Sequence, residues 1–317
     1  MSASRILQVI ALAGSPGADE EIQRRHQAHQ YWKVQDKEAF LRDHAKDIEV
    51  IITSAMGGCR KELIDALPNL KAICSWGVGY DTIDVDAAKQ RGIVVSNTPE
   101  VLNDCVADLA WGLLIAAARH IAQGDRLVRA NHWENKTATL PLGTRVSGKK
   151  LGVVGLGRIG HAIARRGFGF DMQVGYHNRS KRSDVSYDYF DSLVELAKWS
   201  DFLVVATVGG ASTKHLINDA VLRALGPKGI IVNIARGPVI DETAMVKALQ
   251  DGALGGAGLD VFEHEPKVPD ALKQMDNVVL TPHIASATHE TRAQMSRLVL
   301  DNVDAFLSTG KVLTLIE

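Results

Sequence analysis

Short apolar runs alternate with amphipathic segments from the beginning of the chain. Runs of strand length occur at Val9–Ala13, Ile48–Thr53, Lys71–Cys74 and Ile93–Ser96. Segments between them, such as Arg60–Leu67, carry apolar residues at helical spacing, so strands and helices should alternate. This alternation predicts βαβ units, which build a parallel sheet.

A long helix is expected just after Thr98-Pro99-Glu100, because Val101–Ala118 has apolar residues at helical spacing. A second series of strand-like runs follows, at Leu151–Gly155, Gln173–His177, Phe202–Ala206, Gly229–Ile234, Gly256–Val261 and Asn277–Thr281. Six strands suit one doubly wound sheet. A last helix, Thr288–Ser308, and the apolar run Val312–Ile316 are then expected to return to the first domain.

The pattern predicts an α/β protein with two doubly wound parallel-sheet domains. Residues 1–98 and 288–317 would form a flavodoxin-like substrate domain. Residues 99–287 would form a Rossmann dinucleotide-binding domain inserted into it. The length of 317 residues suits two domains that each bury a core.

Composition narrows the classes of function. The chain has 36 Lys and Arg against 37 Asp and Glu, a net charge of -1, which favours neither nucleic acid nor an anionic membrane as a partner. Its longest apolar stretch, Leu109–Ala118, is too short to span a bilayer and is interpreted as a buried helix. The three cysteines lack CxxC spacing and the apolar run Ile6–Ala13 is unlike a secretory signal, so a cytoplasmic location is expected.

The motif GxGxxG occurs at the end of one apolar run and the start of a helical pattern. Gly155 would allow a tight turn, Gly157 would let the backbone approach a pyrophosphate, and Gly160 would let the helix pack on the strand. The helix N-terminus then offers N–H groups to phosphates. A glycine-rich turn that binds nothing is the alternative, but the strand–turn–helix order favours a dinucleotide.

The turn after the next strand should recognise the 2′-position of the adenosine ribose. An acidic residue there would favour NAD, but the chain has Asn178-Arg179-Ser180 followed by Lys181 and Arg182. Arg179 can hold a 2′-phosphate with two donors, and Asn178 and Ser180 can add hydrogen bonds. We predict that NADP is preferred and that NAD is possible; a solvated basic turn is the alternative.

Three polar segments follow predicted strands and contain Arg236, Glu265 and His283. Ligands of open α/β sheets bind beyond the carboxyl ends of strands, so these segments should converge on one site. A protonated imidazole at His283 can give a proton to a ketone that receives a hydride, and Glu265 would orient and charge that ring. The guanidinium of Arg236 suits the carboxylate and carbonyl of a 2-oxo acid.

These segments resemble the D-isomer-specific 2-hydroxyacid dehydrogenase family, and the resemblance covers essentially the whole chain. The other matching stretches are Gly77-Val78-Gly79-Tyr80-Asp81, Asn97-Thr98-Pro99, Val106-Ala107-Asp108 and the GLGRIG turn. The resemblance implies that Arg236, Glu265 and His283 are catalytic, that Arg236 and His283 also bind substrate, and that backbone amides around Val78 and Gly79 hold the substrate carboxylate. It also implies that Asp260 contacts the nicotinamide carboxamide. Met56 and Gly77 are also expected at the substrate, with a packing role as the alternative for Met56. The further residues expected at the cofactor are Val106, Arg158, Ile159, Ile234, Ala235 and Ser286.

Within the family, the basic turn and the Pro-His-Ile-Ala-Ser-Ala motif are most similar to glyoxylate and hydroxypyruvate reductases, including hydroxyphenylpyruvate reductases. Family dimers use the region around Leu127–Trp133, so a homodimer is expected. The loop Thr207–Ala211 departs from the Pro-rich segment typical of the family, which affects the expected contacts to the adenosine and phosphates.

Two other functions are compatible with parts of this pattern. A nicotinamide-sensing corepressor shares the fold and retains an Arg, Glu and His set, so the fold alone does not separate it from an enzyme. A formate dehydrogenase would have Gln in place of Glu265. Neither His264 nor His289 belongs to an HExxH motif, so no metal site is expected. The pattern identifies neither the physiological 2-oxo acid nor the direction of the reaction.

Overall fold

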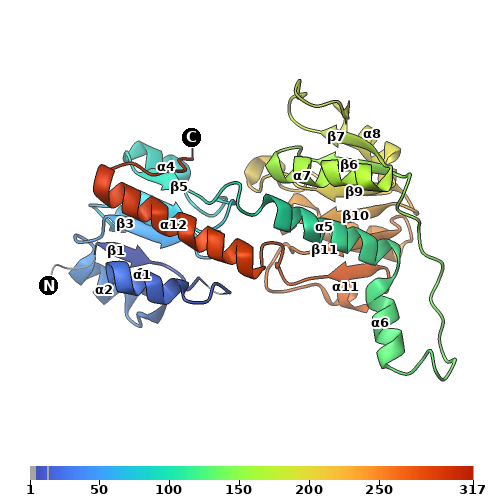
Figure 1. Ribbon diagram of the computed structural model, residues 1–317, viewed down its shortest axis with the longest axis horizontal. Coiled ribbons are helices and arrows are strands. Elements are labelled where there is room, and N and C mark those ends of the chain that lie inside the picture. The colour runs from blue at the N-terminus through green and yellow to red at the C-terminus, as the bar shows by residue number, and fades with distance from the viewer. Residues whose placement is uncertain (1–4, 13, 317) are drawn as a thin grey trace. The chain divides into compact units, whose positions relative to one another are not determined.

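The computed structural model describes residues 5–12 and 14–316, which form two compact units (Figure 1). One unit comprises Met1–Leu102 with Ser286–Glu317, and the other comprises Asn103–Ala285. The boundaries lie a few residues from the expected 98/99 and 287/288. Residues 99–102 belong to the first unit, and Thr98 just before them donates its N–H to the carbonyl of Gly77.

The first unit is built on five parallel strands in the order β2-β1-β3-β4-β5. This is the order of flavodoxin-like sheets, as expected from the sequence. The strands are β1 Ile6–Gln8, β2 His29–Gln30, β3 Val50–Thr53, β4 Ala72–Ser75 and β5 Val94–Ser96. The central strands β3 and β4 are buried along their whole length, as is usual for parallel strands covered on both faces.

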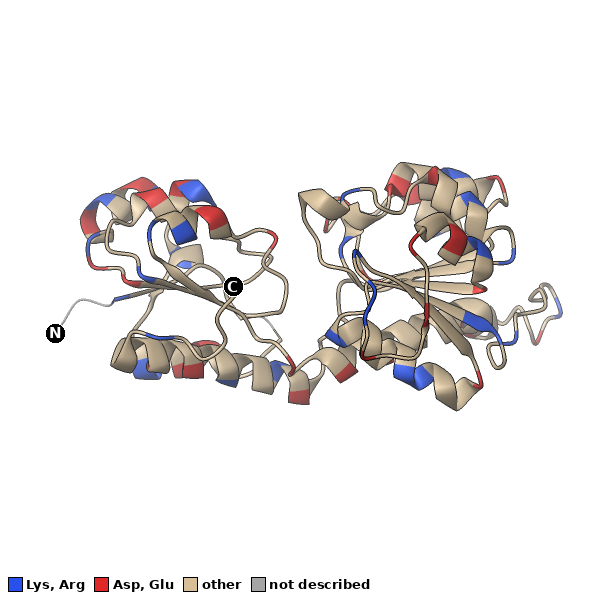
Figure 2. Cartoon of the chain, turned by 90° about the horizontal axis from the view of Figure 1, so that it is seen from above, with Lys and Arg blue, Asp and Glu red and all other residues tan. Residues whose placement is uncertain are grey.

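The helices of the first unit cover both sides of this sheet (Figure 2). They are α1 Ala18–His26, α2 Lys37–His44, α3 Lys61–Ala66, α4 Val85–Gln90 and α12 His289–Thr309, with a short 3-10 helix at Tyr31–Lys33. Helix α12 packs against β4, and the residues after it return to the edge of the sheet, where the N–H of Ile316 donates to the carbonyl of Val95 at 2.8 Å. The predicted return of the chain to the first domain is confirmed.

The second unit is built on seven parallel strands in the order β12-β11-β10-β9-β6-β7-β8. If β6 is counted as the first strand, the order read from β8 to β12 is 3-2-1-4-5-6-7. This is the Rossmann order 3-2-1-4-5-6 with β12 added at the end, so the predicted fold class is confirmed. The strands are β6 Lys150–Val154, β7 Gln173–His177, β8 Asp188–Tyr189, β9 Phe202–Val205, β10 Ile230–Asn233, β11 Gly256–Leu259 and β12 Val278–Leu280.

Helices also cover both sides of the second sheet (Figure 2). They are α5 Asn103–Ala118, α6 Ile121–Arg129, α7 Arg158–Arg166, α8 Leu193–Trp199, α9 Asp219–Leu225, α10 Glu242–Gln250 and α11 Asp270–Gln274, with 3-10 helices at Gly167–Phe170, Ala211–Thr213 and Gly237–Val239. Helix α5 packs against α7, β10 and β11, while α8, α9 and α10 share a core with the sheet. Because the strands are parallel, the carboxyl ends of β6 and β9–β12 all lie along the same edge of the sheet.

Two predictions about strands were wrong. The first strand is Ile6–Gln8 instead of Val9–Ala13; residues 9–12 lie outside any strand, and Ala13 lies outside the described residues. The predicted six-strand sheet has a seventh member, β8, at its edge. Strands β2 and β8 have two residues each, too few to show an alternating pattern in the sequence.

Lys, Arg, Asp and Glu are interspersed over the helices of both units (Figure 2). Among residues 5–12 and 14–316, no single helix is long and apolar enough to cross a bilayer. Helices α5 and α6 meet that length and composition only when taken together, across a bend of 64°. Eight residues of α5 are buried, which agrees with the interpretation of Leu109–Ala118 as a core helix.

Candidate active site

His283 and Glu265 lie on adjacent turns at the carboxyl edge of the second sheet. Glu265 follows β11, His283 follows β12, and these two strands are paired in parallel. The Nδ1 atom of His283 lies 2.8 Å from Oε2 of Glu265, and both side chains are about one-third exposed, at 36% and 31%. Because Nδ1 is bound to the carboxylate, Nε2 is the ring nitrogen left to face a reactant.

The carboxylate of Glu265 is stabilised in its ionised form. Burial acts to raise its pKa, but the hydrogen bond and charge of His283 act in the opposite direction. The Phe262 amide and the charge of Arg236 add to the effect of His283, so the pKa of Glu265 lies below its usual value. An ionised Glu265 can accept the hydrogen bond from the Nδ1–H of His283 and so orient the imidazole ring.

Asp260 organises the turn that presents His283. It is fully buried, and its Oδ1 atom accepts hydrogen bonds from the Thr281 hydroxyl at 2.7 Å and the Ile284 N–H at 2.8 Å. Its Oδ2 accepts the Ala285 N–H at 2.9 Å, and its backbone carbonyl accepts the His283 N–H at 2.8 Å. These bonds hold His283 at φ 54, a left-handed conformation uncommon for residues other than glycine. The expected contact of Asp260 with the nicotinamide carboxamide stays a prediction.

Arg236 lies on the turn after β10, beside the strand that leads to Glu265. Asn233 at the end of β10 shapes this turn, since its Oδ1 accepts the Ala235 N–H and its Nδ2 donates to the Arg236 carbonyl, both at 3.0 Å. Arg236 is half-buried and its charge lowers the pKa of Glu265. The structure thus brings the three predicted catalytic residues together at the ends of neighbouring strands.

The GxGxxG segment forms the turn from β6 into α7. Gly155 has φ +91, and a Cβ there would lie 2.6 Å from the Cα of Thr207; a Cβ on Gly160 would lie 2.0 Å from the Gly155 carbonyl oxygen. Both glycines are therefore required by the close packing of this turn. Gly157 is exposed and ends the turn as the N-cap of α7, which no side chain caps. Its position leaves the first amides of α7, at Arg158 and Ile159, at a helix N-terminus suited to a pyrophosphate.

The basic turn after β7 is tied to the glycine turn. Asn178 Oδ1 accepts the Leu156 N–H at 2.6 Å, and Arg182 donates to the Leu156 carbonyl at 2.8 Å while also pairing with Asp184. Arg179 and Ser180 are exposed and, within the described part of the chain, have no hydrogen-bond or ion-pair partner. Two of the three residues predicted to contact the 2′-position are therefore available, and Asn178 also shapes the glycine turn.

The other predicted cofactor residues are found in different environments. Val106 in α5 and Ile234 and Ala235 after β10 have buried side chains. Ser286 is half-buried and belongs to the first unit, where it begins the C-terminal segment.

In the first unit, the predicted substrate turn follows β4. Thr98 holds it through two bonds of 3.0 Å, from its N–H to the Gly77 carbonyl and from the Gly77 N–H to its hydroxyl, and Asn97 Nδ2 donates to the Val78 carbonyl at 2.9 Å. The N–H groups of Val78 and Gly79 have no acceptor among the described residues. Two adjacent free amides of this kind suit a carboxylate.

Met56 lies at the tip of the turn after β3 and is 85% exposed. Ser54 fixes this turn, because its hydroxyl accepts the Met56 N–H at 3.1 Å. A residue that packs in the core would be buried, so the alternative packing role of Met56 within the first unit is wrong. Its contact with substrate stays a prediction.

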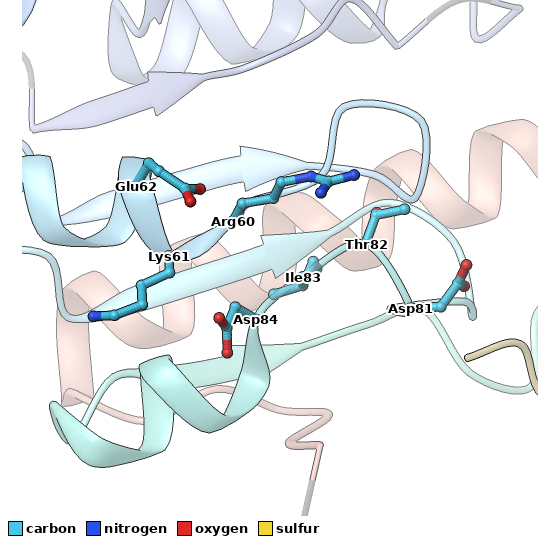
Figure 3. A pocket seen from close by; sticks show the side chains of 7 residues that line it. All are labelled: Arg60, Lys61, Glu62, Asp81, Thr82, Ile83 and Asp84. Atoms are coloured by element: carbon cyan, nitrogen blue, oxygen red, sulfur yellow. The ribbon is translucent and has the colours of Figure 1, made fainter. Parts of the chain in front are cut away.

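A separate cavity of about 350 Å³ in the first unit lies between the start of α3 and the segment before α4 (Figure 3). Two cations and three anions line it: Arg60 and Lys61, and Glu62, Asp81 and Asp84. This balance gives no preference for the negative charge of a 2-oxo acid. Among the described residues, no group of three or more His, Cys, Asp or Glu could hold a metal ion.

Residues 111–285 match the family model of the D-isomer specific 2-hydroxyacid dehydrogenase, NAD binding domain. The chain belongs to the D-isomer-specific 2-hydroxyacid dehydrogenase family. It is 46% identical over 296 residues to hydroxyphenylpyruvate reductase of Plectranthus scutellarioides, covering 93% of this chain and 94% of the relative. It is 44% identical to glyoxylate/hydroxypyruvate reductase A of Arabidopsis thaliana, with the same shares covered.

A solved structure gives a similar comparison. The NADPH-dependent glyoxylate/hydroxypyruvate reductase of Sinorhizobium meliloti, in complex with NADP and malonate, aligns with a TM-score of 0.90 at 42% identity, covering 99% of this dehydrogenase and 97% of that chain. The second unit is thus the nicotinamide-dinucleotide domain of a family dehydrogenase, and the residues of its glycine turn fit the cofactor.

Sequence reasoning did not assign the roles of several residues that shape this dehydrogenase site. Asn233 holds the Arg236 turn, Asp260 holds the His283 turn, and Glu242 binds the N–H of Glu263 in the Glu265 turn. The only signal in the sequence is that Asn233 and Asp260 lie near the ends of predicted strands, and no predicted element included Glu242. That position is shared by many residues without such a role.

Proposed function

We propose that this dehydrogenase reduces a small 2-oxo acid, such as glyoxylate or hydroxypyruvate, to the D-2-hydroxy acid with NADPH. The observation that carries the proposal is the 2.8 Å pair of His283 and Glu265 beside Arg236, on the sheet that bears the dinucleotide turn. The relatives named above are reductases, which favours an enzyme over a nicotinamide-sensing corepressor.

Each residue has a distinct role in the proposed reaction. The nicotinamide, when bound, supplies a hydride to the carbonyl carbon of the substrate. The imidazolium of His283 gives the Nε2 proton to the carbonyl oxygen, so that C=O becomes CH–OH. Glu265 holds the ring through Nδ1 and compensates its charge. Arg236 holds the carboxylate and polarises the carbonyl. The expected donation of hydrogen bonds from the Val78 and Gly79 amides to a substrate carboxylate stays a prediction.

A substrate panel tests this proposal directly. Glyoxylate, hydroxypyruvate and aromatic pyruvates such as hydroxyphenylpyruvate are each compared by kcat/KM with NADPH and with NADH, and the product's configuration is determined. We expect turnover of at least one 2-oxo acid to a D product, with NADPH more efficient than NADH. Cofactor binding without turnover of any of these acids would favour the binding-protein alternative.

The preference for NADPH rests on the turn after β7. Asn178→Asp keeps an oxygen acceptor for the Leu156 N–H, so the glycine turn should persist, but it places a negative charge where a 2′-phosphate would bind. We expect kcat/KM with NADPH to fall about 10- to 100-fold, since like charges at short range cost a few kcal/mol. The kcat/KM with NADH should stay the same or rise, because a carboxylate can bind the 2′-hydroxyl of the ribose.

Two companion variants complete the cofactor test. Gln250→Glu makes the same charge change at an exposed site of the second unit, outside α6 and the segment after it, and should leave both efficiencies unchanged. Arg179→Ala should weaken NADPH alone. Equal losses with the two cofactors in Asn178→Asp would refute discrimination by this turn.

We also propose that the dehydrogenase is a homodimer that uses α6 and the segment after it. Five large apolar side chains are exposed there: Ile121, Val128, Trp133, Leu140 and Leu142. A cavity of about 510 Å³ adjoins them, and it is lined by Gln123, whose buried amide has no partner among the described residues. An apolar patch of this kind is typical of an interface. Sedimentation should give twice the 34.3 kDa chain mass, and a monomer at micromolar concentration would contradict the proposal.

A cytoplasmic location is proposed from the cysteines. Burial raises the pKa of Cys59 to about 12 and that of Cys74 to about 11, so both remain thiols, and neither forms a disulfide. Subcellular fractionation tests this location.

A further inference from the structure

The turn that carries Glu265 is held by side chains from two other segments. Within the turn, the Phe262 N–H donates to Oε1 of Glu265 at 3.0 Å. From outside it, Oε2 of Glu242 accepts the Glu263 N–H at 3.2 Å, and the Nε2 atom of His215 lies 3.0 Å from Oε1 of Glu263. The Glu265 turn, residues 262–265, is therefore tied both to helix α10 and to the loop after β9.

Glu242 is an unusual residue for its position. It is the first residue of α10 and only 8% exposed, whereas Glu residues are seldom buried unless paired. Burial raises its pKa, and the hydrogen bond from the Glu263 N–H opposes that shift. The proposed reaction gives Glu242 no role of its own. Because the buried carboxyl of Glu242 accepts a hydrogen bond from the backbone of the Glu265 turn, we infer that the turn requires an acceptor there.

The Glu265 turn also lies against the turn that carries Arg236. A Cβ added to Gly237 would lie 1.9 Å from the carbonyl carbon and oxygen of Phe262, so the backbones of the two turns are in direct contact. His215 adds to this packing, since its N–H donates to the carbonyl of Pro238 at 2.8 Å. A shift of the Phe262–Glu263 peptide would therefore move Glu265 relative to both Arg236 and His283.

We propose that Glu242, supported by the pair of His215 and Glu263, is a positioning residue that keeps Glu265 in hydrogen-bonding register with His283. The inference rests on the proposed function, because it assigns Glu242 an effect on the reaction only through Glu265. Glu242 touches neither substrate nor cofactor in this proposal. Its removal leaves the Glu263 N–H without its acceptor and lets the turn relax.

The first experiment compares two substitutions of Glu242. Glu242→Ala should lower kcat for 2-oxo acid reduction about 10- to 50-fold, because displacements of an ångström or less in a catalytic group cost up to about 100-fold. The KM of the 2-oxo acid and the Kd of NADPH should change less than about threefold on the same argument. Glu242→Gln retains an oxygen acceptor of the same length and should stay within about threefold of wild type.

A matched control separates this effect from general loss of a glutamate. Glu195 lies in the first turn of α8 in the same unit, is exposed, and its side chain has no bond within the described residues. Glu195→Ala should leave kcat unchanged. If Glu242→Gln proves as impaired as Glu242→Ala, the hydrogen-bond acceptor is not what matters and the proposal fails.

A double-mutant cycle gives the decisive readout. Glu265→Gln alone should lower kcat strongly, and adding Glu242→Ala to it should lower kcat less than about twofold further, because the step through which Glu242 acts is already lost. The same 10- to 50-fold factor in both backgrounds would overturn the inference. If Glu265→Gln itself retains wild-type turnover, the proposed mechanism fails instead, so the two failures are distinguishable.

His215→Ala provides a test should Glu242→Ala not fold. The His215 side chain is 37% exposed, so its truncation should cost little stability. We expect a loss of about 3- to 10-fold in kcat that disappears in the Glu265→Gln background. A wild-type kcat in His215→Ala, or a loss that persists unchanged in that background, would contradict the assigned role of the turn.

Discussion

Replacing His283 with alanine should lower kcat for 2-oxo acid reduction by about 10²- to 10⁴-fold, the contribution typical of a positioned general acid. The loss follows because His283 Nε2 is the proposed proton donor, with Nδ1 already engaged by Glu265 at 2.8 Å. The Kd of NADPH, measured by quenching or calorimetry, should stay near the wild-type value, since the glycine turn lies at the end of a different strand.

Backbone conformation affects the choice of variant. His283 has φ 54, and Asn adopts the left-handed region more readily than Ala does. His283→Asn should therefore preserve the turn held by Asp260 while still removing the acid. His289→Ala, an exposed histidine of α12, is the matched control and should be fully active. Turnover within tenfold of wild type in both His283 variants would remove the general-acid assignment.

The same network predicts how the carboxylate responds to loss of its partner. Burial alone raises the pKa of Glu265, and His283 is the main cause of its net lowering. In the wild type, the stability that the ionised carboxylate contributes is fully present above the ordinary pKa of 4.5 and is lost as the pH falls from there through the lowered value. Without the His283 ring, the pKa should rise, so that protonation begins at higher pH.

The alternating pattern was sufficient to predict the architecture because the strands that matter are long and buried. Strand β7 occupies Gln173–His177 as predicted, and the other central strands of its sheet differ by one or two residues at their ends. The first strand was placed too late because the apolar run continues past Gln8, although only the Val9 N–H still bonds to β3, at the Ile52 carbonyl, and residues 10–12 leave the sheet. Edge strands β2 and β8 pair with one neighbour each and have only two residues, which leaves no periodic signal.

The site was predictable where chemistry dictates a residue type, and less so where geometry does. An acid, a carboxylate partner and a guanidinium after successive strands indicate reduction of a 2-oxo acid, and the structure brings Arg236, Glu265 and His283 together. Asn178 was interpreted as a phosphate ligand, but its Oδ1 binds the Leu156 N–H, a contact between segments 22 residues apart. The bonds of Asp260 to Ile284 and Ala285 likewise depend on register between neighbouring strands, which the sequence does not specify.

Arg236→Ala should lower affinity and turnover together, which separates it from the His283 variants. A guanidinium that binds both the carboxylate and the carbonyl acts in the bound substrate and in the transition state, so KM should rise while kcat falls. Loss of one partner of a desolvated charge pair costs about 2–5 kcal/mol, so kcat/KM should fall about 30- to 5,000-fold. Arg236→Lys keeps the charge but loses the planar pair of donors, and should recover only part of the loss.

Asn233 makes this prediction sharper. It holds the Ala235–Arg236 backbone through two bonds of 3.0 Å, so the turn should persist even though truncation of Arg236 removes the 2.8 Å bond from its guanidinium to the Ala235 carbonyl. The loss in Arg236→Ala is then attributable to the missing charge and donors. Arg223→Ala, which removes an exposed arginine of α9 that pairs with Asp219, controls for net charge and should behave as wild type. A variant Arg236→Ala whose KM stays normal while only kcat falls would mean that the guanidinium does not hold the substrate in the ground state. The carboxylate would then have to be bound by other groups.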